Sequence, residues 1–178
     1  MDLGTGLKIV GRALGFLVLI VLLFVLSAQT GFLPLFAEEY ERTELEFGSC
    51  DAERESQIEV RVADTSSQKY VGLSRTSSLP KDEGLLFPYE NDSEKRIEMR
   101  NMNFGLDIIY VSSNGTINAI ESLDKPSSAI EHYLLYESVS REGQYVIEVN
   151  KGWSDRVGVS EGDCVYGLNE ITDRDAER

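Results

Sequence analysis

The amino-acid sequence predicts a mainly β protein: a compact β-sandwich or barrel-like domain with one or two short helices, preceded by a single N-terminal transmembrane helix. Three observations support this fold class. Residues 13–37 contain no charged side chain, which is typical of a segment that crosses a bilayer. Roughly seven or eight short segments within residues 53–168 have the apolar alternation or β-branched composition of strands. Turn residues separate these segments, and only two stretches have helical signals.

The N-terminal apolar segment is long enough to span a membrane. Its core reads ALGFLVLIVLLFVL, and a bilayer interior about 30 Å thick requires roughly 20 apolar residues in a helix. We therefore expect a transmembrane helix over residues 13–35. A cleaved signal peptide is the alternative, with an apolar stretch over residues 13–26 and a cut near Ser27 and Ala28. The cleavage site is poor and the apolar run continues to Phe36, which favours an uncleaved anchor.

The charges on either side of this segment predict its orientation. Lys8 and Arg12 precede it, whereas acidic residues follow it at positions 38, 39 and 41. Basic residues are retained on the cytoplasmic side of a membrane. We therefore expect a single-pass protein of the cell membrane, with residues 1–12 in the cytoplasm and residues 38–178 outside.

The part of the chain after the anchor is strongly acidic. The whole sequence has a formal net charge of −14, and residues 38–178 contain 15 basic and 30 acidic residues. Such a surface repels nucleic acid, so no nucleic-acid partner is predicted. An acidic exterior with few lysines is also expected of a protein that lives in high salt, where screening reduces self-repulsion. The simpler alternative is an acidic protein that its charge keeps soluble.

The compact domain is expected to begin some distance after the anchor. Residues 36–52 are charged and irregular, and they predict a stalk or a short edge strand that contains Leu45 and Phe47. The compact domain itself is predicted over residues 53–168. Its first strand covers residues 58–62, because apolar residues at every second position indicate a strand with one buried face.

A short helix is predicted directly after this strand. Thr65 or Ser66 can cap its N-terminus, because a hydroxyl oxygen accepts a hydrogen bond from a backbone N–H of the first turn. The helix is expected to extend through Leu73, with Gly72 near its end.

The remaining elements are mainly short strands. Pro88 is expected to stop one of them, since proline has no N–H to donate. Asn114 and Gly115 lie between two apolar runs, which is a strong signal for a hairpin. The polar tail over residues 169–178 is expected to fray. In order, strands are predicted at residues 84–87, 96–99, 107–111, 116–122, 144–149 and 163–166, with one helical turn at residues 154–159.

Several sequence blocks follow one another in a distinctive order. They are Val62–Thr65, Gly72–Leu73, Asp82–Phe87, Met99–Met102, Leu106–Val111, Gly143–Val149 and the ending Gly158…Gly162-Asp163. In this order they resemble the domain of unknown function 192 family over about two thirds of the chain. The resemblance departs at Ser74, where family members often carry Met, and at Gly105, where they often carry Pro. It implies a compact, mostly β fold that is commonly exported or membrane-tethered, with no established activity and no mechanism to carry over.

Cys50 and Cys164 are the only two cysteines of the chain. If the domain lies outside the cell, both face an oxidising compartment. A bridge between them would close a long loop and contribute about 4–5 kcal/mol in the chain-entropy model. Two unpaired thiols, one in the stalk and one in the core, are the alternative, because sequence alone does not bring the two within reach.

No cofactor and no metal are predicted. The chain has one histidine, His132, and no Cys or His spacing of a zinc site. The abundance of carboxylates leaves calcium or sodium as an open alternative, although no calcium-binding loop of the helix–loop–helix type is present. The sequence also lacks a Gly-x-Ser-x-Gly motif and a glycine-rich phosphate loop, which argues against nucleophilic catalysis.

The candidate site consists of Arg75, Glu98, Arg100 and Asp107. Glu98 and Arg100 share one face of a predicted strand. Asp107 begins an apolar strand, so its carboxylate is expected to lie at a sheet edge or to be partly buried. Because buried charges are paired, the first interpretation is a structural contact between Arg100 and Asp107. The alternative is a small cleft that binds an anionic or polyhydroxyl ligand.

These residues lead to two hypotheses about function. The first is a non-catalytic binding or structural module of the cell envelope, which would bind a polysaccharide, a peptide or a partner protein. The second is a hydrolase of envelope carbohydrate that uses Asp107 with Glu98 or Arg100, because paired carboxylates can act as acid and base on a glycosidic bond. Two sequons, at Asn91 and Asn114, lie in predicted turns and agree with exposure outside the cell.

Overall fold

The computed structural model describes residues 15–19, 22, 40–51, 54–168 and 171. The chain divides into two units, residues 1–39 and 40–178. In the first unit, residues 15–19 are helical. Within the residues described, no helix is both long and apolar enough to cross a membrane. The predicted cytoplasmic segment, most of the predicted membrane span and most of the polar tail lie outside the described residues.

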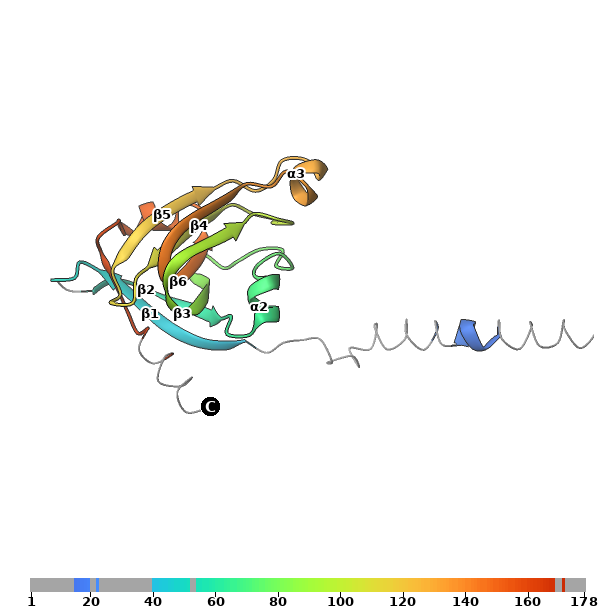
Figure 1. Ribbon diagram of the computed structural model, residues 1–178, viewed down its shortest axis with the longest axis horizontal. Coiled ribbons are helices and arrows are strands. Elements are labelled where there is room, and N and C mark those ends of the chain that lie inside the picture. Colours follow the sequence, from blue (N-terminus) through green and yellow to red (C-terminus); the bar gives the residue numbers. More distant parts are fainter. Residues whose placement is uncertain (1–14, 20–21, 23–39, 52–53, 169–170, 172–178) are drawn as a thin grey trace, which may run out of the picture. The chain divides into compact units, whose positions relative to one another are not determined.

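The second unit is built on a single seven-stranded sheet that curls into a half-barrel (Figure 1). The mainly β class is therefore confirmed, but one curled sheet replaces the two facing sheets of a sandwich. The spatial order is β5-β4-β6-β3-β2-β1-β7, and only β2 and β3 run parallel. The strands are β1 (Glu41–Gly48), β2 (Arg54–Val62), β3 (Glu83–Glu98), β4 (Leu106–Val111), β5 (Ile117–Leu123), β6 (Ser138–Asn150) and β7 (Cys164–Tyr166).

The strand β1 lies inside the sheet, within the interval predicted as a stalk or an edge strand. It pairs with β2 on one side and with β7 on the other. Leu45 and Phe47 are completely buried, as their alternation indicates. The interior position depends on β7, which follows β1 by more than a hundred residues and offers only three pairing positions. No local pattern in β1 could reveal that partner.

The strand β3 joins two strands that the sequence predicts separately. Pro88 does not end it, because Pro88 still lies opposite Tyr145 of β6. The register shifts between Pro88 and Ser93, and regular pairing then continues to Glu98. Proline is tolerated in sheets at such irregularities, because the ladder there does not require its missing N–H. The second half of β3 is thereby extended beside β6.

Among the residues that the structure describes, three short helices, α2, α3 and α4, accompany the sheet. The predicted capped helix is α2 (Ser66–Val71), in which Thr65 accepts from the Gln68 backbone N–H and the Gln68 side chain accepts from the Thr65 N–H. Gly72 ends it, with φ of +50°. The predicted helical turn is α4 (Trp153–Val157). The sequence did not indicate α3 (Ala129–Tyr133), which Ser128 caps.

The two faces of the sheet bury separate hydrophobic cores. Alternation along β6 assigns Ile147 and Val149 to the first core and Val146 to the second. In the first core the rings of Phe47 and Trp153 meet edge to face, with centroids 5.0 Å apart. The second core lies on the same side as α2 and includes Leu73 just after it. Ile171, from the segment predicted as a fraying tail, is buried in the first core.

Cys50 and Cys164 form a disulfide in this fold, with their Cα atoms 4.9 Å apart. The pairing of β1 with β7 brings them together, because Gly48 lies opposite Cys164. The bond closes a loop with a sequence separation of 114 residues. It therefore connects the beginning and the end of the domain covalently.

We expect the double variant Cys50→Ser/Cys164→Ser to lose about 4–5 kcal/mol of unfolding free energy, because opening so long a loop restores entropy to the unfolded chain. Urea unfolding of the oxidised protein and the variant measures this loss. A reductant should lower the wild-type midpoint to that of the variant and leave the variant unchanged. Equal midpoints in the oxidised protein and the variant would contradict the expectation.

Candidate functional site

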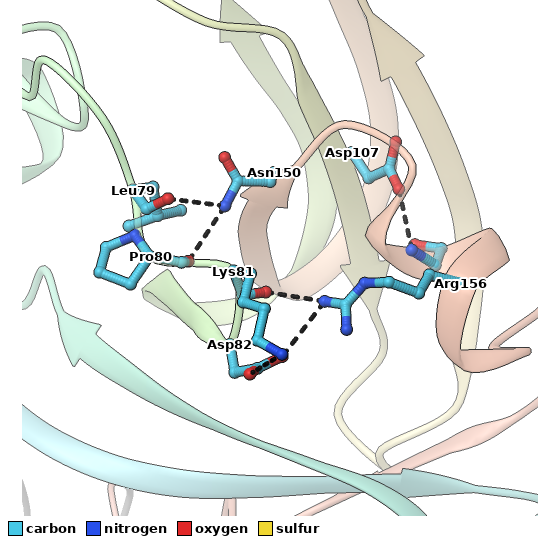
Figure 2. A network of polar contacts seen from close by, with 8 residues as sticks. Leu79, Pro80, Lys81, Asp82, Asp107, Asn150 and Arg156 are labelled. Carbon is cyan, nitrogen blue, oxygen red and sulfur yellow. Dashed lines mark hydrogen bonds and ion pairs between the residues drawn. The ribbon is translucent and has the colours of Figure 1, made fainter.

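Asp107 is buried and fully hydrogen-bonded within the domain. Its side chain is 1% exposed. One carboxylate oxygen accepts from the Ser122 hydroxyl at 2.6 Å and from the Gly152 N–H at 3.0 Å, and the other accepts from the Ser154 N–H at 3.0 Å. Asp107 thus binds the N-terminal backbone of α4, as Figure 2 shows from close by. Both of its oxygens thus accept hydrogen bonds from within the domain.

The same region contains further polar contacts that join the loop before β3 to the end of β6 and to α4 (Figure 2). The Asn150 amide donates to the carbonyls of Leu79 and Pro80 at 2.9 and 3.0 Å. The Arg156 guanidinium donates to the Lys81 carbonyl at 2.8 Å and contacts the Asp82 carboxylate at 3.2 Å. These bonds tie distant segments together and support the position of α4.

Arg100 does not contact Asp107, contrary to the first interpretation of the sequence. Its Nη1 donates to the Tyr70 hydroxyl at 2.9 Å, and its guanidinium lies 4.6 Å from the centroid of that ring. The register explains the separation, because Asp107 lies opposite Val149, whose side chain belongs to the first core. Cross-strand partners share a face. Asp107 therefore lies on the face of the sheet opposite to α2, which carries Tyr70.

A cavity of about 410 Å³ lies between α2 and the extended part of β3. Glu98 and Arg100 both line it, whereas Arg75 and Asp107 do not. Arg75 is exposed in the turn after α2. We call this space the α2–β3 cavity. Its lining combines aromatic, cationic and acidic side chains: Tyr70, Phe87, Tyr89 and Tyr136; Lys69, Arg96 and Arg100; Glu98 and Glu148.

Cations are stacked against the aromatic rings of this cavity. Besides Arg100 on Tyr70, the Lys69 ammonium lies 4.7 Å from the centroid of Tyr89. Each such contact is worth about 0.5–1 kcal/mol at an exposed site, and more when water is excluded. Arg96 forms an ion pair with Glu98 at 3.2 Å. The cations are therefore held in defined positions around the opening.

The acid Glu148 is the most unusual residue of the cavity. It is 5% exposed, and its Oε2 atom has no hydrogen-bond partner among the described residues. Burial raises its pKa from 4.5 to about 8, against the opposing effect of the Arg61 charge. A buried acid without a full set of partners is costly, so such groups mark candidate functional sites. At neutral pH Glu148 carries its proton and can both donate and accept.

Two tyrosines near Glu148 are held in their neutral form. Burial, together with the charge of Glu148, raises the pKa of Tyr89 to about 12. Burial also raises the pKa of Tyr110, whose hydroxyl donates to the Val139 carbonyl at 3.4 Å. Both rings therefore offer hydroxyl groups rather than phenolates across the physiological pH range.

Sequence reasoning did not select Glu148, although a signal for it exists. It is the one acid in the strand sequence YVIEV, whose other positions are apolar. In the structure it lies opposite Leu85 of β3 and Ile108 of β4, both in the second core. An acid at a position flanked by two core residues indicates a special role. The alternation pattern showed the strand, but not which face carried the cavity.

The part of the chain that the structure describes has other cavities of similar size, among them three of 390–420 Å³. Their volumes do not distinguish them from the α2–β3 cavity. Their lining does, because it includes no buried acid or base. The two sequon asparagines, Asn91 and Asn114, are exposed on the surface and line none of these cavities.

These features define a class: a small half-barrel β-domain with a polar and aromatic cavity beside a short helix. The family model of domain of unknown function 192, described as an uncharacterized ACR, matches residues 49–167. The chain belongs to this family. No curated protein matches it.

Among the solved structures that share the fold are the following two. One is a protein of Sinorhizobium meliloti 1021, described as a candidate transcription regulator, with 26% identity and a TM-score of 0.64. The match covers 74% of this chain and 97% of that one. The other is a protein of unknown function from Novosphingobium aromaticivorans DSM 12444, with 22% identity and a TM-score of 0.62. That match covers 73% of this chain and 88% of the other, and it shows the fold alone.

The structural role of Asp107 predicts the behaviour of Asp107→Asn. An amide in this position places an N–H against a backbone N–H, so we expect a loss of about 2 kcal/mol of unfolding free energy. Urea unfolding measures it. Asp124→Asn is the matched control, because the Asp124 side chain is 82% exposed, and it should change stability little. An Asp107→Asn protein as stable as the control would show that these hydrogen bonds contribute nothing.

The raised pKa of Glu148 predicts a pH dependence of stability. Between about 4.5 and about 8, the unfolded chain releases the Glu148 proton that the folded protein keeps. This group therefore lowers stability as pH rises through that window, with a limiting slope of about 1.4 kcal/mol per pH unit, and its effect levels off above the window. The Glu148→Gln variant has no titratable group at this position, so its unfolding free energy lacks this dependence on pH.

Urea unfolding of both proteins at about pH 5, 6, 7 and 8 tests this sign. The unfolding free energy of Glu148→Gln, relative to the wild type, should increase steadily with pH. A constant difference between the two proteins would mean that Glu148 ionises at its ordinary pKa in the folded state.

Proposed function

We propose that this protein is a membrane-anchored, extracytoplasmic binding module that holds envelope polysaccharide in the α2–β3 cavity. The observation that carries the proposal is the composition of that cavity. Tyrosine rings and hydrogen-bonding side chains surround it, and a buried acid reaches it from the sheet. Binding sites are typically concave and combine aromatic surface with a few convergent polar groups. Sugar rings offer matching apolar faces and hydroxyl groups.

The surroundings of Asp107 favour binding over hydrolysis. A hydrolase that used Asp107 would need that carboxylate open to substrate, at a defined separation from a second carboxyl group. Internal hydrogen bonds occupy both of its oxygens, and it does not line the α2–β3 cavity. Glu98, its expected partner, does line the cavity and is paired there with Arg96.

The proposed location rests on the sequence before residue 40 and on the disulfide. The uncharged segment and its flanking charges support a single span with the domain outside. The bond between Cys50 and Cys164 fits an oxidising compartment. A role in regulating transcription, as in the description of the Sinorhizobium protein, is not proposed here. Acids outnumber bases two to one in residues 38–178, which disfavours binding to nucleic acid.

Right-side-out membrane vesicles that carry the full-length chain test this function. We expect them to retain a fluorescent polysaccharide from a panel of dextran, galactan and polygalacturonate. Vesicles without the chain should retain none, and external protease should remove the binding. Tyr70→Ala should weaken retention roughly fivefold through loss of an aromatic contact. Tyr133→Ala is the control, because Tyr133 is equally exposed in α3 but does not line the cavity.

Each other outcome contradicts a different part of the proposal. No retention of any polysaccharide would remove the binding function. Retention that Tyr70→Ala leaves unchanged would place the ligand outside the α2–β3 cavity. Retention that external protease leaves unchanged would mean that binding does not depend on a domain exposed outside the membrane. Release of new reducing ends from the bound polymer would identify a hydrolase instead of a binding module.

A further inference from the structure

We propose that the α2–β3 cavity selects a saccharide that bears a carboxylate, a uronic acid unit. Arg100 pairs with the carboxylate, and Glu148 donates a hydrogen bond to the sugar from β6. This inference rests on the proposed polysaccharide binding and specifies its chemistry. Charge, geometry and the protonation of one buried acid support it independently.

The charge of the cavity is opposite to that of the domain. Residues 38–178 contain twice as many acids as bases. The lining of the α2–β3 cavity nevertheless includes three cations, Lys69, Arg96 and Arg100, against the exposed acid Glu98. With Glu148 protonated, the cavity is net positive. A positive recess in a strongly negative surface attracts anions there and nowhere nearby.

Arg100 is positioned to receive a carboxylate. Its contact with the Tyr70 ring and hydroxyl fixes the guanidinium plane. A guanidinium has five N–H donors, and the Tyr70 hydroxyl takes one of them. A planar fork of this kind matches the two oxygens of a carboxylate. Because the group is already ordered, binding costs less side-chain entropy than it would for a mobile arginine.

Glu148 supplies the second recognition group. Within the described part of the chain its Oε2 atom has no hydrogen-bond partner, and the residue lines the cavity while remaining buried. The charged and titratable groups around it are Arg61 of β2, Tyr89 of β3, Tyr110 of β4 and Lys69 of α2. A protonated carboxyl group can donate to one sugar oxygen and accept from a hydroxyl. Ionised, it would repel an acidic sugar instead.

Isothermal titration of the full-length chain in detergent tests the proposal. The probes are trigalacturonate, its neutral counterpart galactotriose, and triglutamate as an acidic peptide. At neutral pH we expect trigalacturonate to bind at least roughly tenfold more tightly than either of the others, as a charge-assisted contact of about 1.4 kcal/mol would give. Arg100→Gln should abolish this preference. Arg75→Gln is the matched control, because Arg75 is exposed outside the cavity.

The pH profile gives an independent readout of Glu148. Above the pKa of about 8, the wild-type affinity for trigalacturonate should fall roughly tenfold per pH unit, since only the protonated fraction is competent to bind. Glu148→Gln keeps a neutral donor and acceptor, so its affinity should stay constant over the same range. A parallel decline in both proteins would remove Glu148 from the site.

The outcomes separate this inference from the function on which it rests. If galactotriose binds as tightly as trigalacturonate, and Arg100→Gln affects both alike, selection of a carboxylate is wrong while polysaccharide binding stands. If triglutamate binds best, the ligand is an acidic peptide and both proposals fail. If no probe binds and the vesicles retain no polysaccharide, the proposed function itself is wrong.

Discussion

The hydrogen bonds accepted by Asp107 connect parts of the domain that are far apart in the chain. Its carboxylate holds the backbone of Gly152 and Ser154, more than forty residues downstream. These charge-assisted bonds fix the start of α4. That position inserts Trp153 into the first core against Phe47 of β1. The chain then continues to β7, which covers the outer side of β1. One buried carboxylate thus determines how the C-terminal segment closes the sheet.

A second buried acid, Glu148, lies one register position away and differs from Asp107 in its hydrogen bonding. Glu148 lies opposite Ile108 and Asp107 lies opposite Val149, so the two carboxyl groups occupy different faces of neighbouring strands. Asp107 accepts from three donors, whereas the Oε2 atom of Glu148 accepts from none of the residues that the structure describes. The sequence singled out the acid with the structural role. The partners of Asp107 could not be predicted from the sequence, because its donors are mostly backbone groups, which a sequence does not distinguish.

Local patterns predicted most of the fold, and long-range contacts account for the differences. The alternation at residues 58–62 and the cap at Thr65 depend on neighbouring residues, and both are found in the structure. Pro88 was expected to end a strand, yet β6 continues to pair with β3 beyond it. Of the four residues predicted to form a cleft, Glu98 and Arg100 line the same cavity. Glu148, which lines the same cavity, comes from β6, about fifty residues later in the chain.

The disulfide also determines how the domain carries a mechanical load. A force applied to the chain outside residues 50–164 passes from one sulfur to the other, and the segment between them bears no tension. The strand β1 lies before Cys50, outside this protected loop. A pull from the N-terminal side therefore acts on β1 alone, between β2 and β7. The tensile strength of the domain in that direction is the resistance of a single strand to being peeled from the sheet.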